Sequence, residues 1–80
     1  MSILTVAVVS PEKTVYEGTA PSVVAPAYDG EVGIMPGHAP LLTLLGEGML
    51  RIGNDVKFKV TGGFMQVADN QVRVVTESAE

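Results

Sequence analysis

The feature of this sequence that most constrains the fold is a succession of short apolar runs separated by turn residues. The first run, residues 3–9, is rich in β-branched side chains and is stopped by Ser10 and Pro11. Further runs follow at a spacing of roughly 8–12 residues, which is typical of an antiparallel sandwich or barrel, and no helix of useful length is visible. We therefore predict eight or nine short strands, at residues 3–9, 14–17, 22–25, 31–34, 41–45, 48–52, 56–60, 64–67 and 71–75. The run 41–45 also fits a helical turn, but its length favours a strand.

Glycine, asparagine and aspartate mark the sharpest turns between these runs. Residues 53–55 and 69–70 each lie between two runs and predict hairpins, because their residue types tolerate the left-handed backbone region of a tight turn. The two glycines at 62–63 indicate a bulge or a close approach of two backbones. The small, polar tail 76–80 predicts either a frayed end or the start of a further segment.

The apolar content is high for so short a chain. Eighty residues make one small domain, residues 1–80, and a chain of this size buries only about 60% of the surface of its unfolded state. The hydrophobic fraction is 46%, so either the domain is very well packed or some apolar surface faces a partner. The side chains in question are Met35, Leu41, Leu42, Leu44, Leu45 and Met49. From the sequence alone, a location in the core and a location on a protein-binding surface are equally well supported for these side chains.

Charge and cysteine content exclude several classes of protein. The formal net charge is −4, with nine acidic and five basic side chains, which argues against a general nucleic-acid binder and a polybasic lipid-binding segment. The chain has no Cys, so it forms no disulfide and no thiolate metal site. The first apolar run lacks the features of a signal peptide, and no stretch approaches the roughly 20 apolar residues of a membrane-spanning helix.

Few residues are candidates for chemistry. His38 is the only His, and the sequence shows neither a second ligand nor a nucleophile for it, which favours a turn-bonding or interface role. Asp29 and Glu31 share one face of a strand, which leaves an acid–base pair in a small β enzyme as an alternative. A carrier-like sandwich, or another protein-interaction module of an unrelated assembly, is a further alternative. A carrier would need a Lys at an exposed hairpin tip, and the turns at 53–55 and 69–70 contain none. We predict no catalytic residue, no metal and no cofactor.

The run from Gly30 to Leu42 is the most specific motif. It reads Gly-Glu-Val-Gly-Ile-Met-Pro-Gly-His-Ala-Pro-Leu-Leu, and its glycines and prolines specify a shaped, rigid connection. The run resembles a motif of the epsilon subunit of F-type ATP synthases, with Val32 for the usual Leu and Met35 at a variable position. Further segments resemble the same family in the same order, at residues 8–12, 15–18, 48–52, 60–67 and 72–79. The resemblance covers essentially the whole chain, with Glu77 where Asp is common in the family.

This resemblance implies an all-β fold, a flattened antiparallel β-sandwich of about ten short strands. It also implies a non-catalytic subunit of the central stalk, which links the gamma subunit to the c-ring and couples proton translocation to ATP synthesis. The c-ring contact, a weak polar one, would comprise Asp29, Gly30 and Glu31. The gamma-subunit contact would comprise Ser10, His38, Leu42 and Thr43. The protein would lie on the cytoplasmic, matrix or stromal face of an energy-coupling membrane, as part of the F1 sector.

Members of this family usually continue into two C-terminal helices, which can inhibit ATP hydrolysis and in some members bind ATP. This chain stops at Glu80, where those helices would start, so we expect a shortened form or a naturally short member of the family. We therefore assign neither inhibition nor nucleotide binding to the chain, and we expect no direct lipid insertion.

Overall fold

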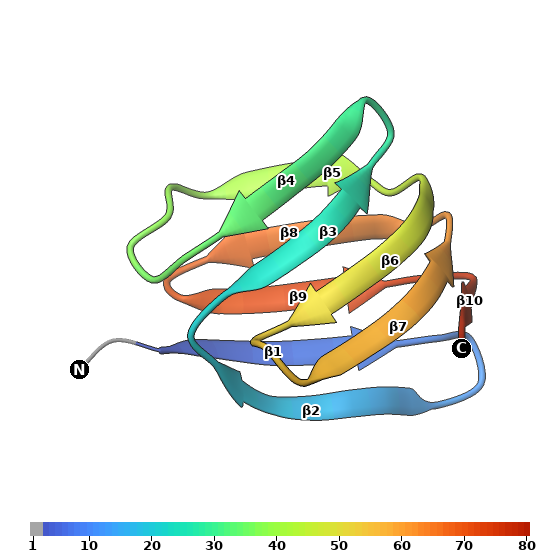
Figure 1. Cartoon of the computed structure of the whole chain (residues 1–80), viewed down its shortest axis with the longest axis horizontal. Helices are drawn as coiled ribbons and strands as arrows, with labels where there is room; N and C mark the ends of the chain where they lie inside the picture. The colour runs from blue at the N-terminus through green and yellow to red at the C-terminus, as the bar shows by residue number, and fades with distance from the viewer. Residues whose placement is uncertain (1–2) are drawn as a thin grey trace.

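The computed structural model describes residues 3–80, so residues 1–2 of the expected domain lie outside the described part. Two five-stranded β-sheets face each other, which confirms the expected all-β sandwich (Figure 1). The strands are β1 (Leu4–Val9), β2 (Thr14–Ala20), β3 (Val23–Ala27), β4 (Gly30–Ile34), β5 (Leu41–Leu44), β6 (Glu47–Ile52), β7 (Val56–Thr61), β8 (Phe64–Ala68), β9 (Gln71–Val75) and β10 (Ser78–Ala79). Within residues 3–80 there is no helix with the length and apolar character needed to cross a membrane.

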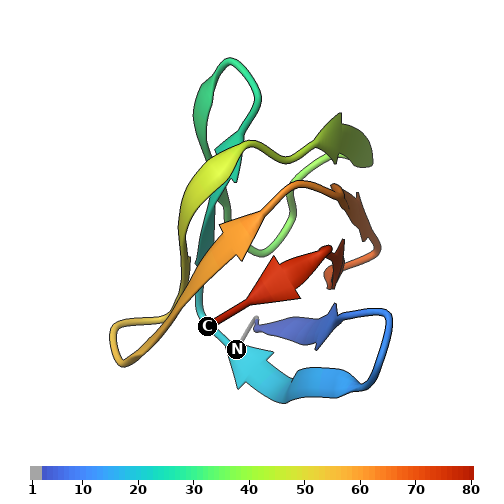
Figure 2. The same cartoon turned by 90° about the vertical axis from the view of Figure 1, so that its right-hand side faces the viewer.

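The two sheets have different connectivity. Sheet A has the strand order β2-β1-β9-β8-β5, and sheet B has the order β10-β7-β6-β3-β4; Figure 2 shows these two layers from the side. Neighbouring strands are antiparallel, except that β1 and β9 pair in parallel, with Val6 opposite Val72. This parallel pair was not predicted. It joins strands from two separate hairpins, so no local turn sets its direction.

The core lies between the sheets and consists of the residues of each strand that point inward. Leu4, Val6 and Val8 of β1 are fully buried. Thr5 lies between two of them and is exposed, as the two-residue period of a strand requires. Sheet B contributes fully buried side chains to the same cluster, among them Val23, Ile34, Leu50 and Val60. Burial of an aliphatic side chain of this size stabilises the fold by roughly 1.5–3 kcal/mol.

The turn between β8 and β9 has the backbone conformation that the sequence predicts. Asp69 and Asn70 have φ angles of 50° and 60°, both in the left-handed region. Asn70 also braces a neighbouring connection, because its Oδ1 accepts a hydrogen bond of 2.7 Å from the amide of Gly37. The turn therefore fixes the connection between β4 and β5 that leads into the apolar run.

Gly63 confirms the close backbone approach predicted for residues 62–63. Its φ is 100°, and a Cβ atom at this position would overlap the carbonyl oxygen of Val75. A side chain at Gly62, where φ is 70°, would meet the carboxylate of Glu77. Glycine is therefore required where β8 begins beside the end of β9.

The tail is a strand rather than a frayed end. Ser78 and Ala79 pair with Thr61 and Val60 of β7, and Glu80 exchanges backbone hydrogen bonds of 2.8 and 2.9 Å with Lys59. Just before this strand, the buried Thr76 hydroxyl lies 3.0–3.4 Å from three carbonyl oxygens, those of Thr61, Gly62 and Ser78. These hydrogen bonds of Thr76 hold the end of the chain against the sandwich. The polar composition of the tail did not predict them.

Candidate functional site

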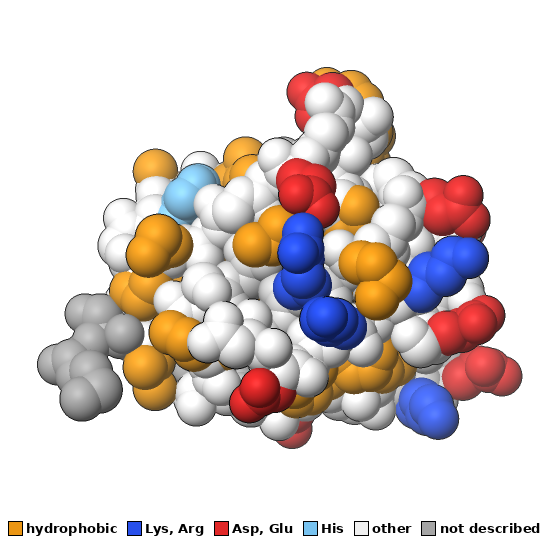
Figure 3. Space-filling view, viewed as in Figure 1, with side chains coloured by type: hydrophobic (Ala, Val, Ile, Leu, Met, Phe, Trp, Pro, Cys, Tyr) orange, Lys and Arg blue, Asp and Glu red, His pale blue; other side chains and the backbone are white. Residues whose placement is uncertain are grey.

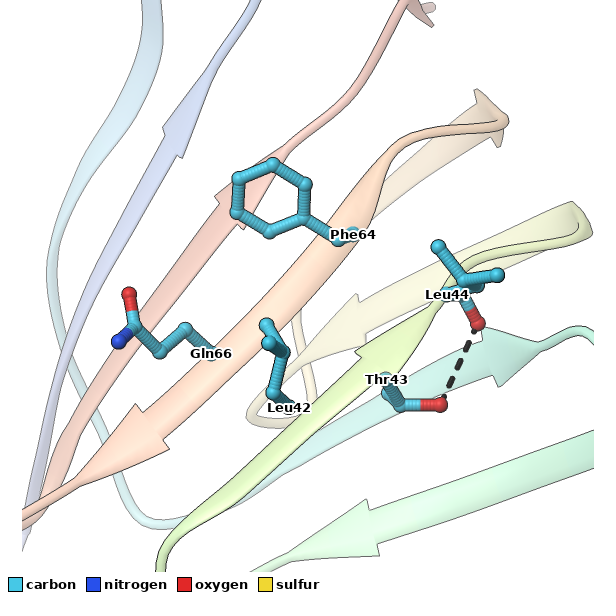
Figure 4. A pocket seen from close by; sticks show the side chains of 5 residues that line it. All are labelled: Leu42, Thr43, Leu44, Phe64 and Gln66. Atoms are coloured by element: carbon cyan, nitrogen blue, oxygen red, sulfur yellow. Dashed lines mark hydrogen bonds between the residues drawn. The ribbon is translucent and has the colours of Figure 1, made fainter.

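An apolar feature of the surface lies where β5 pairs with β8. Leu42, Leu44 and Phe64 are 69%, 62% and 38% exposed, and we call these three side chains the apolar strip. The register places Leu44 opposite Phe64 and Leu42 opposite Gln66. Together with Thr43, these residues line a hollow of about 420 Å³. Figure 4 shows the lining side chains on two neighbouring strands.

The structure separates the run 41–45 into exposed and core positions. Leu42 and Leu44 are exposed on the outer side of sheet A, whereas Leu41 and Thr43 are half-buried. Leu41 packs against the core. Thr43 lies opposite Met65, which is fully buried, and Leu45 is 6% exposed. The alternation follows from the strand period, so the expected gamma-contact residues Leu42 and Thr43 face opposite sides of the sheet.

Charge is distributed unevenly between the two sheets. The strands of sheet A contain two charged side chains, Glu17 and Arg73. The strands of sheet B contain five, which are Glu31, Glu47, Arg51, Lys57 and Lys59. Figure 3 shows basic and acidic side chains across the face of sheet B. Protein-binding surfaces are depleted of charge at their centres, so sheet A is the better candidate for a stable protein contact.

A second surface feature is the hairpin formed by β3 and β4. Its turn contains Tyr28, which is 70% exposed, followed by Asp29 and Gly30, whose φ is 134°. In Figure 3 this tip stands away from the body as a knob with acidic and hydrophobic side chains. The expected c-ring contact residues 29–31 therefore lie together on one projecting element.

Glu31 is already engaged by a basic side chain. Its Oε2 lies 3.0 Å from Nη2 of Arg51, and the two side chains are 58% and 46% exposed. The pair reaches across β3, because Glu31 lies opposite Pro26 and Arg51 lies opposite Val24. An exposed pair of this kind is worth about 0–1 kcal/mol. The acid–base alternative requires a free Glu31 carboxylate beside Asp29. In the structure this carboxylate is paired with Arg51.

His38 hydrogen-bonds a turn, as the sequence predicts. Its backbone amide donates to the carbonyl of Met35 at 3.1 Å, and its ring Nδ1 lies 2.7 Å from the carbonyl oxygen of Ala39. The carbonyl can only accept, so Nδ1 carries the proton in this contact. Among residues 3–80 there is no group of three or more His, Asp or Glu side chains that could hold a metal ion.

Ser10 lies far from His38. Its amide and its hydroxyl donate to the carbonyl of Lys13 at 2.8 and 3.2 Å, within the turn that follows β1. The pairings show that β1 and β5 run in the same direction, and Ser10 follows the end of β1 whereas His38 precedes the start of β5. The two residues therefore lie at opposite ends of sheet A, and their partner contacts stay predictions.

Sequence reasoning missed residues of both candidate surfaces. Phe64 and Gln66 complete the hollow beside β5, and Arg51 pairs with Glu31. The alternation along β8 predicts that Phe64 and Gln66 share a face, but the pairing of β5 with β8 depends on contacts distant in sequence.

These features define a class of protein, a small ten-stranded β-sandwich with an exposed apolar strip on a sheet that carries little charge. Residues 3–80 match the model of the family described as "ATP synthase, Delta/Epsilon chain, beta-sandwich domain". The chain belongs to this family.

Relatives with the name "ATP synthase epsilon chain" support the assignment. The chain is 46% identical over 84 residues to that of Brevibacillus brevis, an alignment covering all of this chain and 64% of the relative. It is 44% identical over 80 residues to that of Synechococcus elongatus, covering 96% of this chain and 58% of the relative. The chain thus spans about three-fifths of the length of these curated relatives.

Solved structures have the same fold. A chain from the Euglena gracilis mitochondrial ATP synthase, solved as OSCP/F1/c-ring, superposes over all of this chain and 54% of its own length, with a TM-score of 0.87 and 20% identity. A chain from the central stalk/c-ring of the Tetrahymena thermophila mitochondrial ATP synthase superposes over 96% of this chain and 65% of its own length, with a TM-score of 0.79 and 22% identity. At these identities the likeness concerns the fold.

Proposed function

We propose that this domain is a non-catalytic connector in the central stalk of an F-type ATP synthase. In this role it binds the gamma subunit and the c-ring, and so couples proton translocation to ATP synthesis. The observation that carries the proposal is the match of residues 3–80 to the family, together with identities of 44–46% to relatives named ATP synthase epsilon chain. The domain would work at the membrane face that carries the F1 sector, on the cytoplasmic, matrix or stromal side.

The apolar strip suits the gamma contact. A stable interface buries on the order of 800 Å² on each partner around a desolvated apolar centre, and Leu42, Leu44 and Phe64 supply such a centre. In this arrangement His38 lies at the border, on the connection that leads into β5, and Thr43 lies in β5 between the two leucines of the strip. Ser10 would join the contact only if gamma extends along sheet A to the end of β1.

The hairpin tip suits the ring contact. Residues 29–31 project from the body on the β3–β4 hairpin, away from the centre of sheet A. A connector needs two contact surfaces on one rigid body. The strip and the tip supply them side by side, since the amide of Tyr28 donates to the carbonyl of Leu44 at 3.1 Å. The acidic side chains of the tip match the polar character expected of the ring loops.

Affinity capture from membranes tests this proposal. The tagged chain, expressed in its source cells, is recovered from membranes solubilised in a mild detergent, and its partners are identified by mass spectrometry. We expect the gamma subunit and the ring to be recovered together with the chain, since a connector binds both at once. The tag alone is the control. Recovery of the chain with neither subunit would contradict the proposal.

A further inference from the structure

The aromatic side chains of this domain are few, and one of them is mostly exposed. Tyr16 and Phe58 pack edge to face, with their ring centroids 6.1 Å apart, and Phe64 belongs to the apolar strip. Tyr28 is instead 70% exposed at the outermost turn of the β3–β4 hairpin. Tyrosine is enriched at protein interfaces because its ring is apolar and its hydroxyl can still bond to water or to a partner.

The backbone that carries Tyr28 is held in place. Its amide donates to the carbonyl of Leu44 at 3.1 Å, and the amide of Gly46 donates to the carbonyl of Pro26 at 2.8 Å. Ala27 and Leu45 form a further bridge between the same two segments. The turn that carries Tyr28 is thus tied to the end of β5, next to Leu44 of the apolar strip. A side chain on a fixed backbone loses less conformational entropy on binding than one on a free loop.

Among the side chains of the tip, Tyr28 is the strongest candidate for an anchor that is buried by a partner. The carboxylate of Glu31 is paired with Arg51 at 3.0 Å, so a partner must compete for it. Asp29 is exposed beside Tyr28 and is absent from the ion pairs of residues 3–80. Exposed charges act mainly at interface rims, whereas buried aromatic side chains dominate binding energies.

We propose that Tyr28 is the apolar anchor of the tip and inserts into a notch of a polar partner surface whose rim carries Lys or Arg side chains facing Asp29. This inference rests on the proposed function, because the c-ring is the partner that it assigns to the tip. It changes the expected character of that contact. The apolar ring of Tyr28 supplies most of the affinity, and Glu31 supplies little.

Binding of the chain–gamma complex to purified c-ring in nanodiscs tests this assignment. We expect Tyr28→Ala to weaken binding about thirtyfold, since a buried aromatic anchor has hot-spot character. Tyr28→Phe keeps the apolar ring and should retain most of the affinity. Glu31→Gln should cost less than about fivefold. The matched control is Met35→Ala, just beyond the other end of β4, where the side chain is 65% exposed, and it should leave binding unchanged.

Two readouts separate this inference from the proposed function. Failure of the unmodified complex to bind the ring would overturn the proposed function and this contact together. Binding by the unmodified complex that Tyr28→Ala weakens no more than Met35→Ala would overturn the anchor alone. The affinity of each variant for gamma and its melting temperature are measured in parallel. If Tyr28→Ala lowers the affinity for gamma instead, the side chain belongs to the other surface and the inference is wrong.

Discussion

Replacing Leu42 or Leu44 with Asp is expected to lower the affinity of the chain for the gamma subunit by about 2–4 kcal/mol, which is roughly thirtyfold to a thousandfold. Both side chains are more than 60% exposed on the outer side of sheet A, so a carboxylate there stays hydrated in the free domain. In the complex the same carboxylate would be desolvated at the centre of an apolar contact. The melting temperature should therefore change by no more than about 6 °C, equivalent to about 1 kcal/mol.

Two further variants control for charge and for position. Thr19→Asp adds the same charge to an exposed position on β2, at the opposite edge of sheet A, and should leave the affinity for gamma unchanged. Thr43→Asp places a carboxylate on the inner side, opposite the buried Met65, and should destabilise the fold. If Leu42→Asp and Leu44→Asp bind gamma as tightly as Thr19→Asp does, the strip is not the gamma-binding surface.

Replacing Gly63 with Ala is expected to destabilise the fold by at least about 3 kcal/mol, or to prevent folding. An added Cβ atom would overlap the Val75 carbonyl, which belongs to the backbone and has no rotamer by which to move away. The residue also has a φ of 100°, which L-residues rarely adopt. Chemical denaturation with the unmodified chain as reference measures the loss in unfolding free energy.

Gly33→Ala is the matched control for this variant. Gly33 lies in β4, and an added Cβ atom there would have no heavy atom within 4 Å. We expect the unfolding free energy to change by no more than about 1 kcal/mol. The added methyl group meets no atom in the folded chain, and Ala lowers the backbone entropy of the unfolded chain. Equal stabilities of the two variants would show that the backbones at Gly63 and Val75 do not approach as closely as described.

Local patterns predicted most of the fold, and non-local pairings account for what was missed. The alternation in residues 56–60 and the turn at 69–70 depend on a few neighbouring residues, so strand positions and hairpins could be predicted. The parallel pairing of β1 with β9 depends on how separate hairpins assemble. β10 is two residues long and polar, and its pairing with β7 depends on the hydroxyl of Thr76, which no periodicity reveals.

The candidate surfaces were predictable to the extent that they are contiguous in sequence. Residues 29–31 form one turn and one strand start, and the run 41–45 contains two members of the apolar strip. The third member, Phe64, joins them through the pairing of β5 with β8. Ser10 and His38 were expected on one partner surface by resemblance, but the direction of β1 relative to β5 puts them at opposite ends of sheet A.

Proton-driven ATP synthesis in membranes depleted of their own epsilon chain tests the connector role most directly. The purified chain is added back, and ATP formed per unit of imposed proton gradient is measured together with the amounts of gamma and ring that bind. We predict that the unmodified chain restores coupled synthesis and that Leu44→Asp does not. Binding of the unmodified chain to gamma and to the ring without any recovery of ATP synthesis would contradict the connector role.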